Sequence, residues 1–362
     1  MKICTITCHN ALNHGARLQA YALTFYLRKQ GHEVEVIDYR PDYMDFRERV
    51  WYWPGLSIKQ WAKLFLQLQQ RIDACCRQRC FEVFSNAYLP RTKVVYRDVE
   101  ELRKNPPSAD VYIAGSDQIW NTSFRNGTDA AYYLDFGTSQ TRRVSYAASF
   151  ATLSLVEGAE HFVREHLSLF DKISVREQSG LDILSSLGFQ GMVVSDPVFL
   201  LSAEEWDETL GCADIDEEYI LVYDFMGSGA VKQIAKRLAK LFRCKIYSIG
   251  SRRLRYADKN FTQSGPNVFV ELIRNARCVV SNSFHGTVFA MIYHRDFFVV
   301  RREDGLNDRM TDLLSCYNLS SRMVDVTATD EVLKENVRYL LVDELLRLQI
   351  AKSKEFLSLA LS

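Results

Sequence analysis

The stretch "KICTITCHNALNHGARLQAYALTFYLRKQGHEVEVIDY", residues 2–39, decides the fold class. It begins and ends with short apolar segments of strand character, and the part between them, residues 15–31, has the spacing of an amphipathic helix. Gly31 is its expected stop. The apolar face of this helix is formed by Leu18, Tyr21, Ala22 and Phe25. A strand, a crossover helix and a second strand predict a parallel sheet with a right-handed connection.

The alternation of strand and helix continues along the chain and predicts two Rossmann-like domains. Apolar strands are expected near 110–115, 143–149, 172–175 and 191–196, and a second series runs from 219 to 326. We therefore expect an α/β fold whose two Rossmann-like domains face a cleft. The expected units are an N-terminal domain, 1–197, a C-terminal domain, 198–326, and a helical segment, 327–362, that packs back on the first domain.

A segment of about residues 45–90 interrupts this alternation. It is rich in helix-forming, aromatic and basic residues, and it contains Trp51, Trp53 and Trp61. We expect a helical insertion packed on the first sheet. The alternative is an element that faces a membrane or covers a bound acceptor, because tryptophan, leucine and arginine together suit an interface.

Composition and charge limit the class of protein. The 362 residues contain 45 Lys+Arg and 45 Asp+Glu, which argues against a general nucleic-acid binder. No apolar run reaches the ~18 residues of a membrane-spanning helix, and the N-terminus lacks the pattern of a signal peptide. The nine cysteines are scattered, as in a reduced cytoplasmic protein. Cys75, Cys76 and Cys80 share one helix but have no second Cys/His pair at zinc spacing, so we expect no metal site.

Polar residues follow the first strand, where an open parallel sheet places its ligands. The loop "CHNALNHGARLQ", residues 8–19, contains Asn10, Asn13, His14 and Gly15 just before a helix. Backbone N–H groups at a helix N-terminus hold anions. We expect Asn13 and Gly15 to contribute to a binding site, with simple capping by asparagine as the alternative.

The segment "AGSDQIWN", residues 114–121, follows another apolar strand. Its expected rim residues are Ser116, Asp117, Gln118 and Asn121, together with Trp120. Asp117 is a candidate for orienting or deprotonating a sugar hydroxyl, and Trp120 for stacking on a sugar face. Helix capping by Ser116 or Asp117 is the alternative.

In "ISVREQSG", residues 173–180, Arg176 directly follows an apolar strand. An arginine there is expected to project into the cleft, where its planar fork suits a carboxylate or a phosphate. The alternative is an internal ion pair with Glu177.

The stretch "VVSNSFHGTVFAMIYH", residues 279–294, predicts a strand, a tight turn and a helix that starts at about Thr287. Asn282 and Ser283 are candidate caps of this helix, whose N-terminus favours an anion. Gly286 allows close approach of the backbone. His285 lies among these donors and is the residue of this turn that exchanges a proton near neutral pH.

Six segments carry a family resemblance in their order along the chain: "NHGARLQAYAL", "AGSDQIWN", "SYAASF", "SVREQSG", "VSDPVFLL" and "NSFHGTVFAMIY". Together they resemble the polysaccharide pyruvyl transferase family over about residues 1–325. The chain departs from the family at His14, where an aromatic residue is expected, so no role is carried over to His14.

The resemblance implies a GT-B-like fold, with the acceptor on the first domain and the donor on the second. It implies phosphoenolpyruvate as co-substrate. Neither release of phosphate nor ketal formation demands a metal, and no metal-ligand cluster is evident in the sequence, so we expect no cofactor and no metal. The pyruvyl group is moved onto two hydroxyls of a sugar in a capsule or exopolysaccharide precursor, as a cyclic ketal, and phosphate is released. In bacteria such acceptors are often lipid-linked oligosaccharides at the cytoplasmic face of the membrane, so peripheral membrane contact is expected.

The chemical properties of the candidate residues suggest roles in this reaction. His285 would protonate the enol carbon or stabilise the leaving phosphate, Arg176 would hold the carboxylate or the phosphate, and Asp117 would act on the sugar hydroxyl. The expected donor-binding set is Arg176, Asn282, Ser283, His285 and Gly286. The expected acceptor-binding set is Asn13, Gly15, Ser116, Asp117, Gln118 and Trp120. Two alternatives remain open, a GT-B glycosyltransferase that uses a nucleotide sugar and a non-catalytic saccharide-binding protein.

Overall fold

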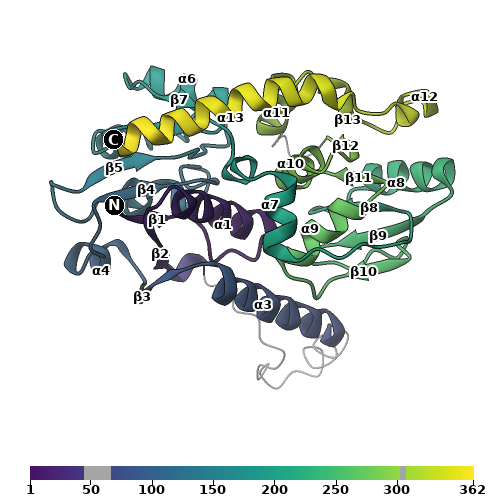
Figure 1. Cartoon of the computed structure of the whole chain (residues 1–362), viewed down its shortest axis with the longest axis horizontal. Coiled ribbons are helices and arrows are strands. Elements are labelled where there is room, and N and C mark those ends of the chain that lie inside the picture. Colours follow the sequence, from purple (N-terminus) through teal and green to yellow (C-terminus); the bar gives the residue numbers. More distant parts are fainter. Residues whose placement is uncertain (45–66, 302–306) are drawn as a thin grey trace.

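The computed structural model describes residues 1–44, 67–301 and 307–362, and within them two large parallel sheets stand side by side (Figure 1). The first sheet has the order β3-β2-β1-β4-β5 and the second the order β10-β9-β8-β11-β12-β13. All neighbouring strands in both sheets are parallel. The predicted α/β fold with two Rossmann-like parallel sheets is confirmed.

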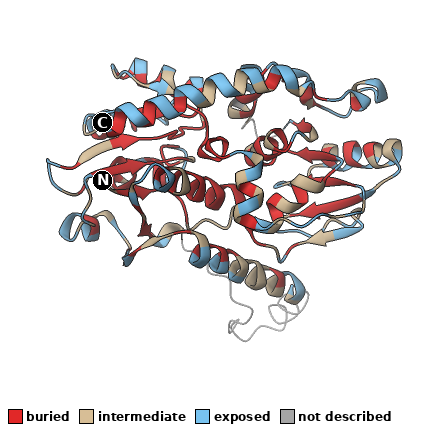
Figure 2. Cartoon of the chain, in the orientation of Figure 1, coloured by how far each residue is buried: buried red, intermediate tan, exposed pale blue. Residues whose placement is uncertain are grey.

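The strands are short and mostly buried (Figure 2). Those of the first sheet are β1 (Lys2–Ile6), β2 (Glu33–Tyr39), β3 (Arg91–Tyr96), β4 (Val111–Ala114) and β5 (Arg142–Ser145). Those of the second sheet are β8 (Tyr219–Tyr223), β9 (Lys245–Ile249), β10 (Lys259–Phe261), β11 (Cys278–Ser281), β12 (Asp296–Val300) and β13 (Met323–Val324). A small parallel pair, β6 (Ser174–Val175) and β7 (Met192–Val193), continues from β5 through isolated bridges.

Helices connect the strands and cover the sheets. In the first half they are α1 (His14–Lys29), α3 (Leu68–Tyr88), α4 (Val99–Lys104), α5 (Glu160–Leu167) and α6 (Gln178–Ser186). The remaining helices are α7 (Ala203–Leu210), α8 (Gly229–Phe242), α9 (Pro266–Asn275), α10 (Phe284–Ile292), α11 (Asp308–Cys316), α12 (Asp330–Lys334) and α13 (Tyr339–Leu361). No helix among the described residues is long and apolar enough to cross a membrane.

Helix α1 is buried on nearly all sides, whereas the sequence predicts one apolar face. The reason is its position, since it packs on the first sheet and also against α9 and α10 of the second half. Its Tyr21 ring lies 5.7 Å from the ring of Trp206 in α7, which in turn lies 5.1 Å from Phe289 in α10. A continuous apolar core therefore joins the two halves.

The predicted insertion, about 45–90, falls partly outside the described residues, because 45–66 and its three tryptophans are not among them. Within the described part, α3 forms a long helix that contacts the second half of the molecule. Its Asp73 carboxylate accepts hydrogen bonds from Arg253 at 2.7 and 3.0 Å and from Thr262 at 2.9 Å. The helix thus bridges the two halves of the molecule.

The C-terminal helix α13 runs across both halves (Figure 1). Near its start, Tyr339 donates a hydrogen bond to the carbonyl of Ala290 at 3.2 Å. Near its end, Ser353 accepts one from the backbone of Ser195 at 2.8 Å. We propose that the fold divides into residues 1–197, 198–326 and 327–362.

Candidate active site

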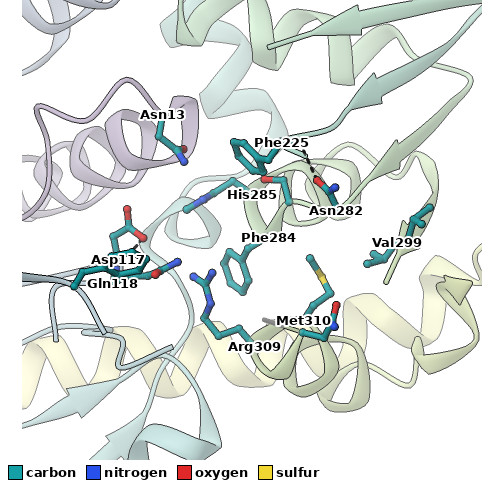
Figure 3. Close-up of a pocket in the computed structure, with 14 residues that line it drawn as sticks. Asn13, Asp117, Gln118, Phe225, Asn282, Phe284, His285, Val299, Arg309 and Met310 are labelled. Atoms are coloured by element: carbon teal, nitrogen blue, oxygen red, sulfur yellow. Dashed lines mark hydrogen bonds between the residues drawn. The ribbon is translucent and has the colours of Figure 1, made fainter. Parts of the chain in front are cut away.

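A cavity of about 320 Å³ lies between the two halves and is lined by residues of both (Figure 3). In each sheet the chain order reverses at one point, between β1 and β4 in the first and between β8 and β11 in the second. The residues that follow these four strands line the cavity: Asn13, Asp117, Phe225 and His285. Ligands of doubly wound sheets bind at such switch points, so we assign this cavity as the candidate active site.

His285 lies in the first turn of helix α10, which begins at Phe284. The sequence-based start at about Thr287 is therefore wrong by nearly one turn. Ser283 caps the helix by accepting a hydrogen bond from the backbone of Gly286 at 3.4 Å. This places His285 beside backbone N–H groups that no preceding turn satisfies, an environment that favours an anionic ligand.

The imidazole of His285 is held between a carboxylate and a glycine. Its Nε2 lies 3.4 Å from Oδ2 of Asp196, and its side chain is only 7% exposed. On the other side, a Cβ atom placed on Gly15 would lie 2.0 Å from Nδ1 of His285. Gly15, predicted to bind an acceptor, therefore acts as the surface against which the His285 ring packs.

Replacing Gly15 by alanine is expected to displace the His285 ring and to lower the free energy of unfolding by about 1–3 kcal/mol, the usual cost of overpacking. Urea titration measures this loss. Gly229→Ala is the matched control, because no atom lies within 4 Å of a Cβ at that helical glycine. Equal unfolding free energies for both variants would contradict the close packing of Gly15 on His285.

Asp196 was not assigned a role from the sequence, although it stands in the "VSDPVFLL" segment. Its Oδ1 accepts a hydrogen bond from the backbone of Val198 at 3.1 Å, and its Oδ2 accepts one from Nη1 of Arg176 at 2.7 Å. Burial raises the pKa of this carboxyl, but the charges of His285 and Arg176 outweigh burial and hold the pKa below its usual range. Asp196 is therefore a buried carboxylate that joins His285 to Arg176.

Arg176 does not project into the cavity as the sequence predicted. Its side chain is 2% exposed and lies behind Phe284, with the guanidinium carbon 4.4 Å from the centre of that ring. Besides Asp196, it faces Glu177 at 3.7 Å and Asp117 at 3.8 Å. Burial lowers the pKa of Arg176, but these three carboxylates raise it above its ordinary value. The internal ion pair considered for Glu177 is thus real, although Asp196 is the closer partner.

Asp117 and Gln118 both line the cavity, as predicted for the loop after β4. The backbone of Asp117 has a φ of 73°, a left-handed conformation that costs energy in residues other than glycine. Ser149 donates a hydrogen bond to its carbonyl at 3.0 Å, and Asn126 donates one to the carbonyl of Gln118 at 2.6 Å. These contacts fix the loop backbone, and the Asp117 carboxylate itself accepts a hydrogen bond from the backbone N–H of Gln118 at 2.9 Å.

Two residues of the same loop do not reach the cavity. Ser116 is fully buried and donates a hydrogen bond to the carbonyl of Ala147 at 2.8 Å. Trp120 is also fully buried, stacked on Tyr133 with ring centres 5.4 Å apart, and its Nε1 donates to the carbonyl of Tyr132 at 3.1 Å. Both residues belong to the core, so the prediction that they contact an acceptor is wrong.

The loop after β1 contributes Asn13 but not His14. Asn13 lines the cavity and caps α1 by accepting hydrogen bonds from the backbone N–H groups of Gly15 and Ala16. His14 is buried, and its ring stacks on Phe269 with ring centres 4.9 Å apart. Burial lowers the pKa of His14 to about 3, which keeps its ring neutral. Of the polar residues predicted in this loop, Asn13 therefore belongs to the candidate site and His14 to the core.

Asn282 connects the loops after β8 and β11 (Figure 3). It does not cap α10, because its Oδ1 accepts a hydrogen bond from the backbone of Phe225 at 3.2 Å. Its Nδ2 donates to Oδ1 of Asp224 at 2.7 Å. Asn282 therefore lines the cavity and at the same time sets the position of the neighbouring loop.

Arg309 of α11 is a cavity residue that the sequence did not reveal. Its guanidinium lies 6.0 Å from the centre of the Phe284 ring and extends toward Gln118 (Figure 3). With the Gln118 amide oxygen turned toward it, Gln118 accepts hydrogen bonds from Arg309 at 2.5 and 2.8 Å. No helix was predicted at 308–316, and a single arginine in a polar segment carries no local signal of a site.

Comparison with known proteins supports a family assignment. A family model described as "Polysaccharide pyruvyl transferase" matches residues 13–304, more than half of the chain. These residues include Asn13, Asp117, Phe225 and His285, which follow β1, β4, β8 and β11 and line the cavity. No curated protein sequence gives a significant match.

Several solved structures resemble this fold at low identity. A UDP-GlcNAc 2-epimerase from Neisseria meningitidis is 11% identical with a TM-score of 0.47, and the match covers 99% of this chain and 94% of that chain. The spinosyn rhamnosyltransferase SpnG is 12% identical with a TM-score of 0.46, covering 97% and 96%. An alpha-glucosyltransferase is 11% identical with a TM-score of 0.48, covering 99% and 95%. Likeness of this degree carries no information about substrate.

Proposed function

The chain belongs to the polysaccharide pyruvyl transferase family, and from that premise we propose that it transfers the pyruvyl group of phosphoenolpyruvate to two hydroxyls of a saccharide. The products are a cyclic ketal and inorganic phosphate, and the saccharide is a precursor of a cell-surface polysaccharide, lipid-linked in our proposal. The observation that carries this proposal is the convergence of Asn13, Asp117 and His285, far apart in the sequence, on one cavity at the switch points of both sheets.

The donor is a small molecule with a carboxylate and a phosphate, so its site needs positive charge. Arg309 and the N-terminal N–H groups of α10 supply it at the cavity. Arg176 lies behind Phe284 and already faces three carboxylates. We therefore assign the direct contact with the donor to Arg309 and not to Arg176.

His285 and Asp117 have complementary tasks in the proposed reaction. A proton from the His285 imidazolium forms the new C–H bond at the methylene carbon of the enol, and the neighbouring carbon becomes electrophilic. A sugar hydroxyl adds to that carbon, with Asp117 accepting its proton. Phosphate then leaves with the electron pair of the C–O bond, and a second hydroxyl closes the ketal. Over one turnover, one of the two hydroxyl protons restores the His285 imidazolium, whose own proton is now in the ketal methyl group. The other leaves with phosphate and returns Asp117 to its carboxylate form.

Asp196 and Arg176 act as positioning residues in this scheme. Asp196 presents a fixed negative charge to one side of the His285 ring, and Arg176 holds Asp196 in place through the 2.7 Å contact. Both side chains are buried, with exposed fractions of 2% for Arg176 and 0% for Asp196, and neither lines the cavity of the candidate active site. A carboxylate in this place orients the ring that exchanges the proton.

Thermal unfolding tests the donor without knowledge of the acceptor. Phosphoenolpyruvate at about 100 times its dissociation constant is expected to stabilise the folded chain by roughly 2.7 kcal/mol, seen as a rise in Tm. Arg309→Ala is expected to abolish this rise, because it removes the cavity arginine. Arg237→Ala is the control, since that arginine pairs with Asp330 on the surface of the second half.

The same assay separates the proposal from its rival. A rise in Tm with a nucleotide sugar and none with phosphoenolpyruvate would contradict a pyruvyl transferase and favour a glycosyltransferase. No response to either donor would also count against the proposal.

A further inference from the structure

The cavity of the candidate active site is bordered by an exposed aromatic ring from each half of the molecule. Phe124 follows β4 and is 52% exposed, and Phe225 follows β8 and is 37% exposed. Both line the same cavity, whose other contributors from these loops are polar. Phenylalanine is among the residues most often fully buried, so two exposed rings in a cavity lined by both polar and apolar side chains fit a ligand with an apolar face.

The loop that carries Phe124 is firmly held. The backbone N–H of Phe124 donates to the carbonyl of Asn121 at 3.0 Å, and Asn126 reaches back to the carbonyl of Gln118 at 2.6 Å. A Cβ on Gly127 would lie 2.2 Å from the backbone of Asn121, so this glycine lets the loop close on itself. The ring of Phe124 is therefore presented from a preformed loop beside Gln118.

The loop that carries Phe225 is held by a residue of the site itself. Asn282 accepts the backbone N–H of Phe225 at 3.2 Å, and Asp224 accepts the N–H of Met226 at 2.9 Å. The Phe225 ring packs on Tyr223 with ring centres 4.8 Å apart. Two exposed rings on fixed backbones indicate a preformed contact surface, because the loops that carry them are ordered before any ligand binds.

We propose that Phe124 and Phe225 form the acceptor subsite, in which the C–H face of a pyranose ring stacks on one or both aromatic rings. The hydroxyl edge of the sugar then faces Asp117 and Gln118. This inference rests on the proposed function for the identity of the ligand as the acceptor, and it assigns to these two residues the stacking role that the sequence had suggested for Trp120.

The chemistry of the cavity selects a sugar. A pyranose combines apolar ring faces with a polar edge, which matches aromatic rings beside a carboxylate and amides. The volume of about 320 Å³ suits one or two small rings. A nucleobase also stacks on aromatic rings, so the experiment includes a nucleoside as a competing ligand.

Saturation-transfer NMR with methyl pyranosides of glucose, galactose, mannose and their 2-acetamido analogues tests the subsite directly. At least one pyranoside is expected to receive its strongest signal at ring protons of one face. Phe124→Ala and Phe225→Ala are expected to weaken its binding by about three- to tenfold. Leu359→Ala is the control, an exposed apolar residue of α13 that is 62% exposed and does not line the cavity.

The outcomes separate this inference from the proposed function. Unchanged pyranoside binding in both phenylalanine variants, or no binding of any pyranoside to the wild-type chain, would overturn the subsite. Uridine binding that depends on the two rings more strongly than pyranoside binding would also overturn it. Phosphoenolpyruvate binding, followed by Tm on the same variants, reports on the proposed function. If phosphoenolpyruvate does not bind but sugar binding still depends on the two rings, the proposed transferase function is rejected and the sugar subsite is retained.

Discussion

His285→Gln is expected to lower phosphate release from phosphoenolpyruvate by about 10²–10⁴-fold, the usual contribution of a general acid. Glutamine keeps much of the size and polarity of the ring but cannot deliver a proton near neutral pH. Because the side chain lies on the apolar surface of Gly15 and 3.4 Å from Asp196, we expect the fold to survive the change. Release of phosphate in the presence of a saccharide acceptor is the measurement.

His294→Gln provides the matched control for this prediction. That histidine is 54% exposed and pairs with Asp343 on the surface. Its replacement is expected to leave turnover within about twofold of wild type, since surface substitutions rarely exceed ±0.5 kcal/mol. Comparable turnover in the His285 and His294 variants would remove His285 from the chemistry.

Asp196→Asn is expected to affect both stability and turnover. Removing one partner of a buried ion pair typically costs about 3–5 kcal/mol, and we expect the lower end here because Glu177 and Asp117 still face Arg176. Turnover is expected to fall by about 10–100-fold, the usual effect of losing the group that orients a functional histidine. Urea titration and phosphate release measure the two effects.

A second variant separates positioning from mere support of the fold. In Asp196→Asn combined with Arg176→Met, the unpaired buried cation is gone, so part of the lost stability is expected to return. Turnover is expected to stay low, because the His285 ring still lacks its carboxylate. Asp330→Asn breaks an exposed pair and is expected to cost no more than about 1 kcal/mol. Recovery of turnover together with stability would show that Asp196 only supports the fold.

The local sequence pattern was sufficient to predict the parallel sheets and the ends of their strands. The apolar segments flanking α1 predicted parallel strands, and the polar residues after β4 and β11 pointed to Asp117, Gln118 and His285 at the cavity. The reason is that strand period and strand ends are local properties, and parallel strands carry their ligand loops at one common edge. Predicting these features requires no knowledge of which loops contact one another.

The direction of individual side chains was not predictable in the same way. Arg176 turns inward because Asp196, three residues beyond the end of β7, approaches it across the small β6-β7 pair. Trp120 turns into the core because Tyr133 offers a stacking partner from a later segment. Arg309 reaches the cavity only through the packing of α11. Each outcome depends on contacts between segments that are distant in the sequence.

Mass spectrometry of saccharides incubated with phosphoenolpyruvate in heavy water tests the central claim most directly. The wild-type chain, given a set of free and lipid-linked oligosaccharides, is expected to yield a product heavier by pyruvate minus water. Its ketal methyl group is expected to carry one deuterium, since the proton added to the methylene carbon comes from an exchangeable group. A ketal without deuterium would contradict protonation by His285. The proposed function would be contradicted if no acceptor yields a ketal and the chain instead transfers a glycosyl group from a nucleotide sugar.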